Sequence, residues 1–179
     1  MAIYKIPDPN AEEGDNIEAV KIEFNYPEQK DFPPKKSKLL FDAESFFYCD
    51  SNFYIVTKNR TQPFNGEALL YKVPAEEGKH KAQYLGSFVP PKGKVNGQIT
   101  SADISPDGKI IVLLGNGTLW VFTDFVLDNF FDSGTLKTID LGVYTQLESV
   151  SFINNGTILL SDEESGKTGR NLYSFVLDN

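Results

Sequence analysis

The stretch that decides the fold class is residues 105–123, which read SPDGKIIVLLGNGTLWVFT. It holds two short runs, residues 109–114 and 118–123, rich in β-branched, aliphatic and aromatic side chains. Such runs favour strands. The intervening Asn116 and Gly117 tolerate the positive φ angles of a tight hairpin turn. The stretch therefore predicts two antiparallel strands joined by a short turn.

The same pattern recurs along the chain. Residues 20–26 alternate apolar and polar side chains, as in a half-buried strand. Further short strand-like runs are separated by turn residues, at 52–58, 67–73 and 157–160. No 12-residue stretch sustains a helical period of 3.6, and residues 122–131 offer only a short helical turn. The chain is therefore predicted to be all-β.

An acidic residue repeats near the start of a strand. Glu44, Asp103 and Glu148 each precede a turn, an apolar strand, a polar loop and a third strand. Of their spacings, 103 − 44 = 59 and 148 − 103 = 45, the second lies within the roughly 40–50 residues of a four-stranded propeller blade and the first lies above it. We expect a β-propeller of about three to four blades of four antiparallel strands, partial or completed by oligomerisation. A β-sandwich or barrel is the structural alternative.

The repeat divides a single propeller-like domain, residues 1–179, into four parts. We expect a half blade in residues 1–26, complete blades in 38–90 and 98–142, and a partial blade in 146–179. Two chains that each end inside a blade would have strand edges to share. The expected assembly is a homodimer that completes a ring.

Several short motifs give the chain a resemblance to known proteins. They are Ile3–Pro7, Asp42–Ser45, Phe53–Lys58, Ile99–Asp103, Ser105–Gly108 and Gln146–Val150. The sequence resembles bacterial secreted or surface-anchored β-propeller proteins, mostly uncharacterised, of the NHL-like and esterase-like phytase-type group. The resemblance implies a propeller fold, a secreted or cell-surface location, and one to two further blades before the first residue.

The repeated acids suggest a metal site. If Glu44, Asp103 and Glu148 occupy equivalent positions on first strands, they converge on the central channel. Three carboxylates around one axis need a cation or a basic side chain between them. Oxygen ligands of this kind suit Ca²⁺, which is the candidate cofactor. In the alternative interpretation, each acid caps its own turn or forms a salt bridge.

Two polar loops are expected on the same face as these acids. One contains Lys58 and Arg60, which would neutralise the acids or bind an anionic group. The other contains Asp162, Glu163 and Glu164. These five residues are the candidate ligand-binding residues. The alternative is a pair of solvated loops with weak surface ion pairs.

Charge and rare residues exclude several functions. The net charge of −8 and the pI near 4.7 argue against nucleic-acid binding. One cysteine, Cys49, and one histidine, His80, expected in a solvated loop, leave no basis for a His-based triad or a thiolate metal cluster. The sequence shows neither a signal peptide nor an apolar run long enough to span a membrane.

These observations predict a propeller module that binds a protein or a small ligand on its channel face, without catalytic residues. The alternative is a calcium-dependent hydrolase of the esterase or phytase type.

Overall fold

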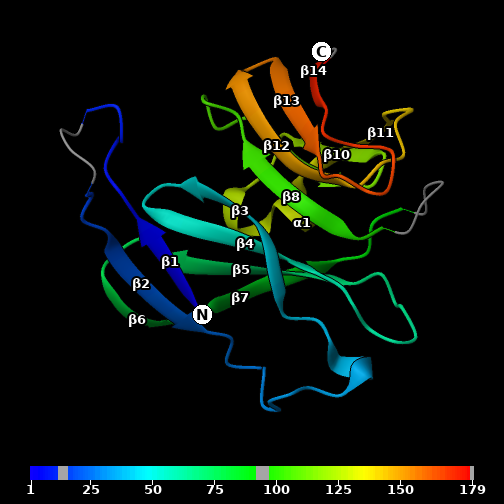
Figure 1. The fold of residues 1–179 in the computed structure, drawn as a ribbon. Coiled ribbons are helices and arrows are strands. Elements are labelled where there is room, and N and C mark those ends of the chain that lie inside the picture. The colour runs from blue at the N-terminus through cyan, green and yellow to red at the C-terminus, as the bar shows by residue number, and fades with distance from the viewer. Residues whose placement is uncertain (12–15, 92–96, 178–179) are drawn as a thin grey trace.

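The computed structural model describes residues 1–11, 16–91 and 97–177. The chain is all-β, as predicted, and its strands form four sheets of three or four strands (Figure 1). The N-terminal sheet contains β1 (Ala2–Lys5), β2 (Val20–Asn25) and β6 (Gly78–Lys81). The second sheet contains β3 (Asp42–Cys49), β4 (Asn52–Lys58), β5 (Ala68–Pro74) and β7 (Gln83–Phe88).

The third sheet contains β8 (Ile99–Ile104), β9 (Ile111–Gly115), β10 (Thr118–Thr123) and β11 (Thr135–Asp140). The C-terminal sheet contains β12 (Leu147–Asn154), β13 (Thr157–Asp162) and β14 (Leu172–Val176). Short helical turns are η1 (Lys36–Lys38), η2 (Leu127–Asn129) and α1 (Phe130–Ser133). In the described residues no helix is long and apolar enough to cross a membrane.

The second, third and C-terminal sheets are antiparallel meanders in which each strand lies beside the next strand of its sheet. The hairpin predicted at residues 116 and 117 joins β9 to β10, and Gly117 has a φ of +81°. The C-terminal sheet has three strands where the two preceding sheets have four. Its outer edge is β14.

The N-terminal sheet departs from this order. β1 and β2 form the expected antiparallel pair, but β6 joins β2 in parallel. This corrects the interpretation of His80 as a loop residue, because it lies on β6 opposite Phe24. β6 comes from the connection between β5 and β7, so the pairing depends on a contact distant in sequence.

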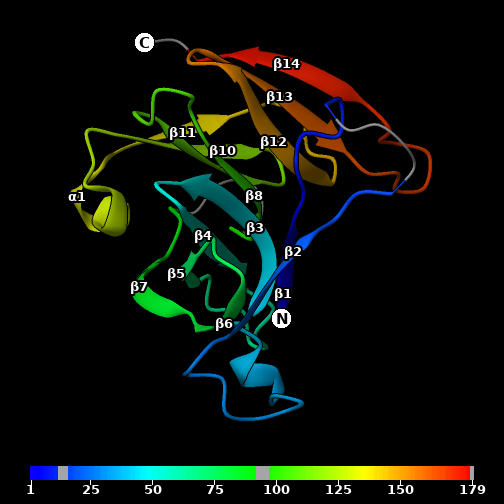
Figure 2. The same cartoon turned by 90° about the vertical axis from the view of Figure 1, so that its left-hand side faces the viewer.

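Apolar side chains between neighbouring sheets form three clusters. One lies between the N-terminal and second sheets and includes Phe24 and Tyr71. Another lies between the second and third sheets and includes Trp120. The last lies between the third and C-terminal sheets and includes Leu114 and Leu160. The sheets therefore stack face to face in chain order (Figure 2).

The first strands of the three meanders are neighbours, with β3 against β8 and β8 against β12. Each of these strands has a register shift near its start, where one extra residue interrupts the pairing with the next strand. The shift falls between Asp42 and Ser45 in β3, at Thr100 in β8 and at Glu148 in β12. Such bulges re-aim a side chain, and they recur here at matching ends of adjacent strands.

Candidate ligand-binding pocket

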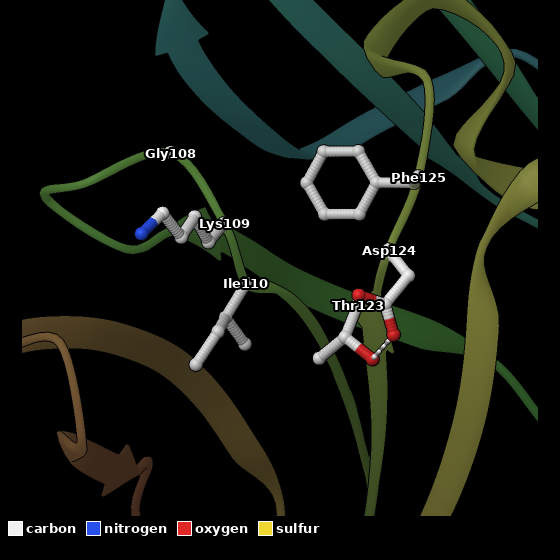
Figure 3. Close-up of a pocket in the computed structure, with 6 residues that line it drawn as sticks. All are labelled: Gly108, Lys109, Ile110, Thr123, Asp124 and Phe125. Atoms are coloured by element: carbon white, nitrogen blue, oxygen red, sulfur yellow. Dashed lines mark hydrogen bonds between the residues drawn. The ribbon is translucent and has the colours of Figure 1, made fainter.

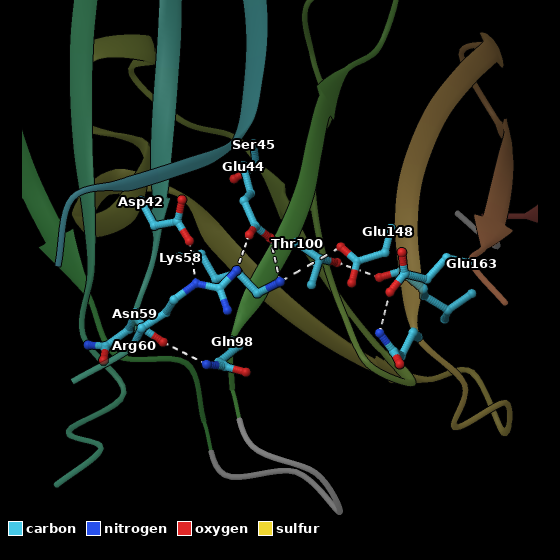
Figure 4. A network of polar contacts seen from close by, with 12 residues as sticks. Asp42, Glu44, Ser45, Lys58, Asn59, Arg60, Gln98, Thr100, Glu148 and Glu163 are labelled. Carbon is cyan, nitrogen blue, oxygen red and sulfur yellow. Dashed lines mark hydrogen bonds and ion pairs between the residues drawn. The ribbon is translucent and has the colours of Figure 1, made fainter. Parts of the chain in front are cut away.

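The bulged ends of β3, β8 and β12 meet at a polar pocket of about 500 Å³ (Figure 4). The ends of β4 and β13 complete its wall. The pocket is lined by Glu44, Lys58, Arg60, Thr100, Gln146, Glu148 and Glu163. Three sheets therefore contribute side chains to one site.

Lys58 is the buried cation of the pocket. Its side chain is only 9% exposed, at the end of β4. Its ammonium donates a hydrogen bond to the Glu44 carboxylate, and Nζ lies 3.8 Å from Oε2 of Glu148. An ammonium removed from water needs such partners, because an unpaired buried charge is strongly destabilising. Lys58 thus ties the second sheet to the C-terminal sheet.

Arg60 forms the outer part of the same network. Its guanidinium pairs with the carboxylates of Asp42 and Glu44, and half of the side chain is exposed. The hydrogen bond to Asp42 raises the pKa of Arg60 against the effect of partial burial, and the contact with Glu44 adds to the rise. The two cations therefore neutralise the β3 acids, as the sequence interpretation allowed.

Glu148 has the least complete set of partners in the network. Burial raises its pKa, and the nearby charges of Glu44 and Glu163 add to this, whereas Lys58 and Arg60 oppose it. Among the described residues, no donor forms a hydrogen bond to its carboxylate. Its side chain is 30% exposed and faces the pocket (Figure 4). The neighbouring Glu163 carboxylate accepts a hydrogen bond from the Gln146 amide.

The network has an excess of negative charge. Of the residues that the structure describes, it contains two cations, Lys58 and Arg60, and four carboxylates, Asp42, Glu44, Glu148 and Glu163, so that 2 − 4 = −2. The cations lie on the Glu44 side, and Glu148 and Glu163 lie on the opposite side, where Glu148 has only the longer, 3.8 Å contact with Lys58 (Figure 4). An incoming group meets a carboxylate-rich surface on that side.

The three predicted calcium ligands do not converge. Glu44 and Glu148 line the pocket, but Asp103 does not. The Asp103 carboxylate accepts the backbone N–H groups of Ile104 (2.9 Å) and Phe152 (2.7 Å), and so links β8 to β12. The position in β8 that lines the pocket is Thr100. Within the described residues, no group of three or more His, Cys, Asp or Glu side chains is arranged to hold a metal ion.

Of the three acids predicted to bind a ligand at the end of β13, only Glu163 lines the pocket. Asp162 is buried, and its carboxylate accepts hydrogen bonds from Asn171 (N, 2.7 Å) and from the Tyr173 hydroxyl (3.0 Å). Burial opposes ionisation of Asp162, but these hydrogen bonds lower its pKa to about 2. Glu164 pairs with Arg170 on the surface. Asp162 is thus a structural residue, and Glu164 lies outside the site.

Sequence reasoning missed several members of the site. Asp42 lies two residues before the predicted site residue Glu44. The period of two in a strand puts both side chains on one face, so the sequence does contain a signal for Asp42. Thr100 is 2% exposed and donates its hydroxyl to the Leu147 carbonyl at 2.6 Å, which fixes β8 against β12. Gln146 lines the pocket beside Glu163. Neither Thr100 nor Gln146 carries a charge that would single it out.

A second pocket of about 340 Å³ lies beside the turn before β9 (Figure 3). It is lined by Gly108, Lys109, Ile110, Thr123, Asp124 and Phe125. The Thr123 hydroxyl contacts the Asp124 carboxylate, while Lys109 points away from both. Its polar groups do not converge on a common point, so the first pocket is the better candidate site.

No protein-family model and no curated protein match the chain. Among solved structures, it is similar to Sqt1 from Saccharomyces cerevisiae, with a TM-score of 0.39 and 8% sequence identity. The match covers 77% of this chain and 35% of that chain. The chain thus spans about a third of the length of that structure.

Proposed function

We propose that the chain is a binding module whose polar pocket receives an organic cation, an ammonium or guanidinium group of a partner. The observation that carries the proposal is Glu148. Its carboxylate is partly buried and faces the pocket, and among the described residues it forms one ion pair, with Lys58 at 3.8 Å. A ligand with N–H donors would give it the charge and the hydrogen bonds that it lacks.

The balance of charge favours a cation over an anion. Lys58 and Arg60 already contact Glu44 and Asp42, so an anion would compete with bonds inside the protein. Burial and the charges of Glu44 and Glu163 raise the pKa of Glu148, and a cation between Glu148 and Glu163 would offset both effects. Lysine and arginine side chains of a protein partner have this chemistry, as do small amines.

We also propose that the chain is a segment of a β-propeller. Three successive meanders stacked face to face, with their first strands adjacent, are the arrangement expected of a β-propeller segment. The recurring bulges on those first strands support equivalent positions in a repeat. Kinship with the NHL-like and esterase-like phytase-type propellers, and the secreted or cell-surface location that it implies, rest on the sequence motifs alone.

The alternative of a calcium-dependent hydrolase lacks a comparable observation. Ca²⁺ takes about six to eight oxygen ligands. The space between Glu44 and Glu148 holds the Lys58 ammonium, whose charge would repel a metal ion there.

Calorimetric titration tests the proposal directly. The probes are N-acetyl-lysine amide, N-acetyl-arginine amide and a short Lys- and Arg-containing peptide, with acetate as the anionic probe. We expect binding of the cationic probes and a loss of about tenfold or more in affinity for the Glu148→Gln/Glu163→Gln variant. The matched control is Glu164→Gln, since Glu164 is an acid of the same segment that pairs with Arg170 outside the pocket.

The titration also separates the sources of the cation. Tighter binding of the peptide than of the single amino acids favours a protein partner, and equal binding favours a small amine. Binding of acetate with no binding of the cations would overturn the proposal. So would cation binding that the Glu148→Gln/Glu163→Gln variant retains in full.

A further inference from the structure

Among the residues that the structure describes, the C-terminal sheet has no strand beyond β14, in the position that β7 and β11 take in the two preceding sheets. Within the described part of the chain, β14 pairs with β13 alone. Its other edge therefore presents backbone N–H and C=O groups without a strand partner. We propose that a second copy of this chain covers the edge, with the two β14 strands pairing antiparallel about a two-fold axis at Ser174.

The composition of β14 suits an edge that is covered. Its five residues, LYSFV, include no charged residue, no proline and no glycine. The strand pairs with β13 without a register shift. Edge strands that stay exposed are usually blunted by charges, proline or bulges. In a chain with 23% charged residues, Leu172 and Val176 are 70% and 61% exposed, which is large for aliphatic side chains.

The sequence of β14 is also symmetric about its centre. In antiparallel pairing at Ser174, Leu172 lies opposite the partner's Val176, and Tyr173 lies opposite the partner's Phe175. Each residue thus meets one of matching character, apolar with apolar and aromatic with aromatic. Cross-strand pairs of these kinds stabilise sheets. This self-complementarity selects a second copy over an unrelated strand.

The two faces of the strand reinforce the same register. Tyr173 and Phe175 are partly buried against the cluster between the third and C-terminal sheets. The aromatic pairs across the two-fold axis would extend that cluster, while the pairs of Leu172 with the partner's Val176 would form on the opposite face. The combined sheet would have six strands, three from each copy. The inference does not depend on what the polar pocket binds.

Sedimentation equilibrium with the full chain tests the pairing. A mass of about twice the 20.0 kDa chain is expected at micromolar concentration. The Leu172→Lys/Val176→Lys variant places like charges opposite each other and should sediment as a monomer. The Leu172→Lys/Val176→Glu variant places opposite charges there instead. It should recover a dimer at least about tenfold tighter than the first variant.

Val126→Lys is the matched control, because Val126 is an aliphatic residue 66% exposed on another part of the surface. It should remain a dimer. Near-UV circular dichroism checks that each variant is folded. A wild-type monomer across the concentration range overturns the inference, as does a dimer that the Leu172→Lys/Val176→Lys variant leaves intact. Equal dissociation constants for the two folded double variants would overturn the proposed register.

Discussion

Lys58 of the second sheet and Glu148 of the C-terminal sheet approach to 3.8 Å between Nζ and Oε2, across the bulged end of β8. The contact joins two sheets that have the third sheet between them in the stack. The Lys58 side chain is mostly buried, and it also binds Glu44. The electrostatics of the pocket and the stability of the stack therefore depend on the same ammonium group.

Removal of this cation should be costly. Lys58→Met leaves the partly buried carboxylates of Glu44 and Glu148 without their shared partner. We expect a loss of about 2–4 kcal/mol in the free energy of unfolding at pH 7, measured by urea denaturation. The control is Lys109→Met, since Lys109 is 80% exposed and lies 3.9 Å from its acid. That control should change stability by less than about 0.5 kcal/mol.

Removal of the Glu148 charge should raise stability, whereas removal of the Lys58 charge should lower it. Burial of Glu148 and the charges of Glu44 and Glu163 raise its pKa above the unfolded value of 4.5, so the folded state holds the proton more tightly. Stability contributed by this group therefore falls as the pH rises from 4.5 through the folded pKa. Glu148→Gln should be more stable than wild type at pH 7.

Urea titrations at pH 4 and pH 7 measure this difference, which should shrink at the lower pH. An advantage of Glu148→Gln that is equally large at both values would show that ionisation of Glu148 is not its cause. Glu164→Gln, which removes a surface acid, serves as the control.

Asp162 should show the reverse dependence. Its folded pKa is lowered to about 2 from 3.8 by the hydrogen bonds it accepts from Asn171 and Tyr173. The stabilisation is present above the unfolded pKa and is lost as the pH falls toward 2. Asp162→Asn should therefore be less stable than wild type at pH 7, and the gap should close in acid. A gap that persists at pH 2 would point to packing as its cause.

Asp103 should act as a structural link. Asp103→Ala leaves the N–H groups of Ile104 and Phe152 without their acceptor, and we expect a loss of about 1–3 kcal/mol in stability. Thermal unfolding with and without millimolar Ca²⁺ distinguishes this role from metal ligation. The loss should be the same in both conditions. A calcium-dependent gain in wild type that Asp103→Ala abolishes would restore the metal hypothesis.

The strands could be predicted because their signals are local. Alternating side chains in residues 20–26 and the turn at Asn116 and Gly117 depend only on neighbours in sequence. The structure places β2 within residues 20–26, and β9 and β10 on either side of the turn. The helical turn predicted in residues 122–131 is present as η2 and the start of α1, although β10 occupies the first two of these residues and α1 continues to Ser133.

Asp103, which was predicted as a metal ligand, shows what the sequence pattern could not predict. Matching acids by sequence put Asp103 beside Glu44 and Glu148, but the bulges place Thr100 there instead. Thr100 lies three residues before Asp103 and carries no charge, so a search for matching acids could not select it. With Thr100, the spacings become 100 − 44 = 56 and 148 − 100 = 48, which are more even than those of the acids.

The parallel strand β6 was out of reach for a different reason. Residues 78–81 have no apolar pattern, and they become a strand only because β2 offers an edge to them. The polar residues around His80 suggested a loop, and residues 78–81 are indeed partly or fully exposed. Their composition, however, does not indicate that they pair with β2, which is distant in the chain.

The parallel pairing of β2 with β6 couples the unfolding of the N-terminal sheet to that of the second sheet. The N-terminal hairpin is bound to a segment that the second sheet holds at both ends, between β5 and β7. Amide hydrogens of β2 that bond to β6 should therefore exchange with solvent together with those of the second sheet. β1 and β2 thus unfold together with strands that are synthesised after them. During synthesis, the amide hydrogens of β2 that bond to β6 become protected from exchange only after residue 81 has been added.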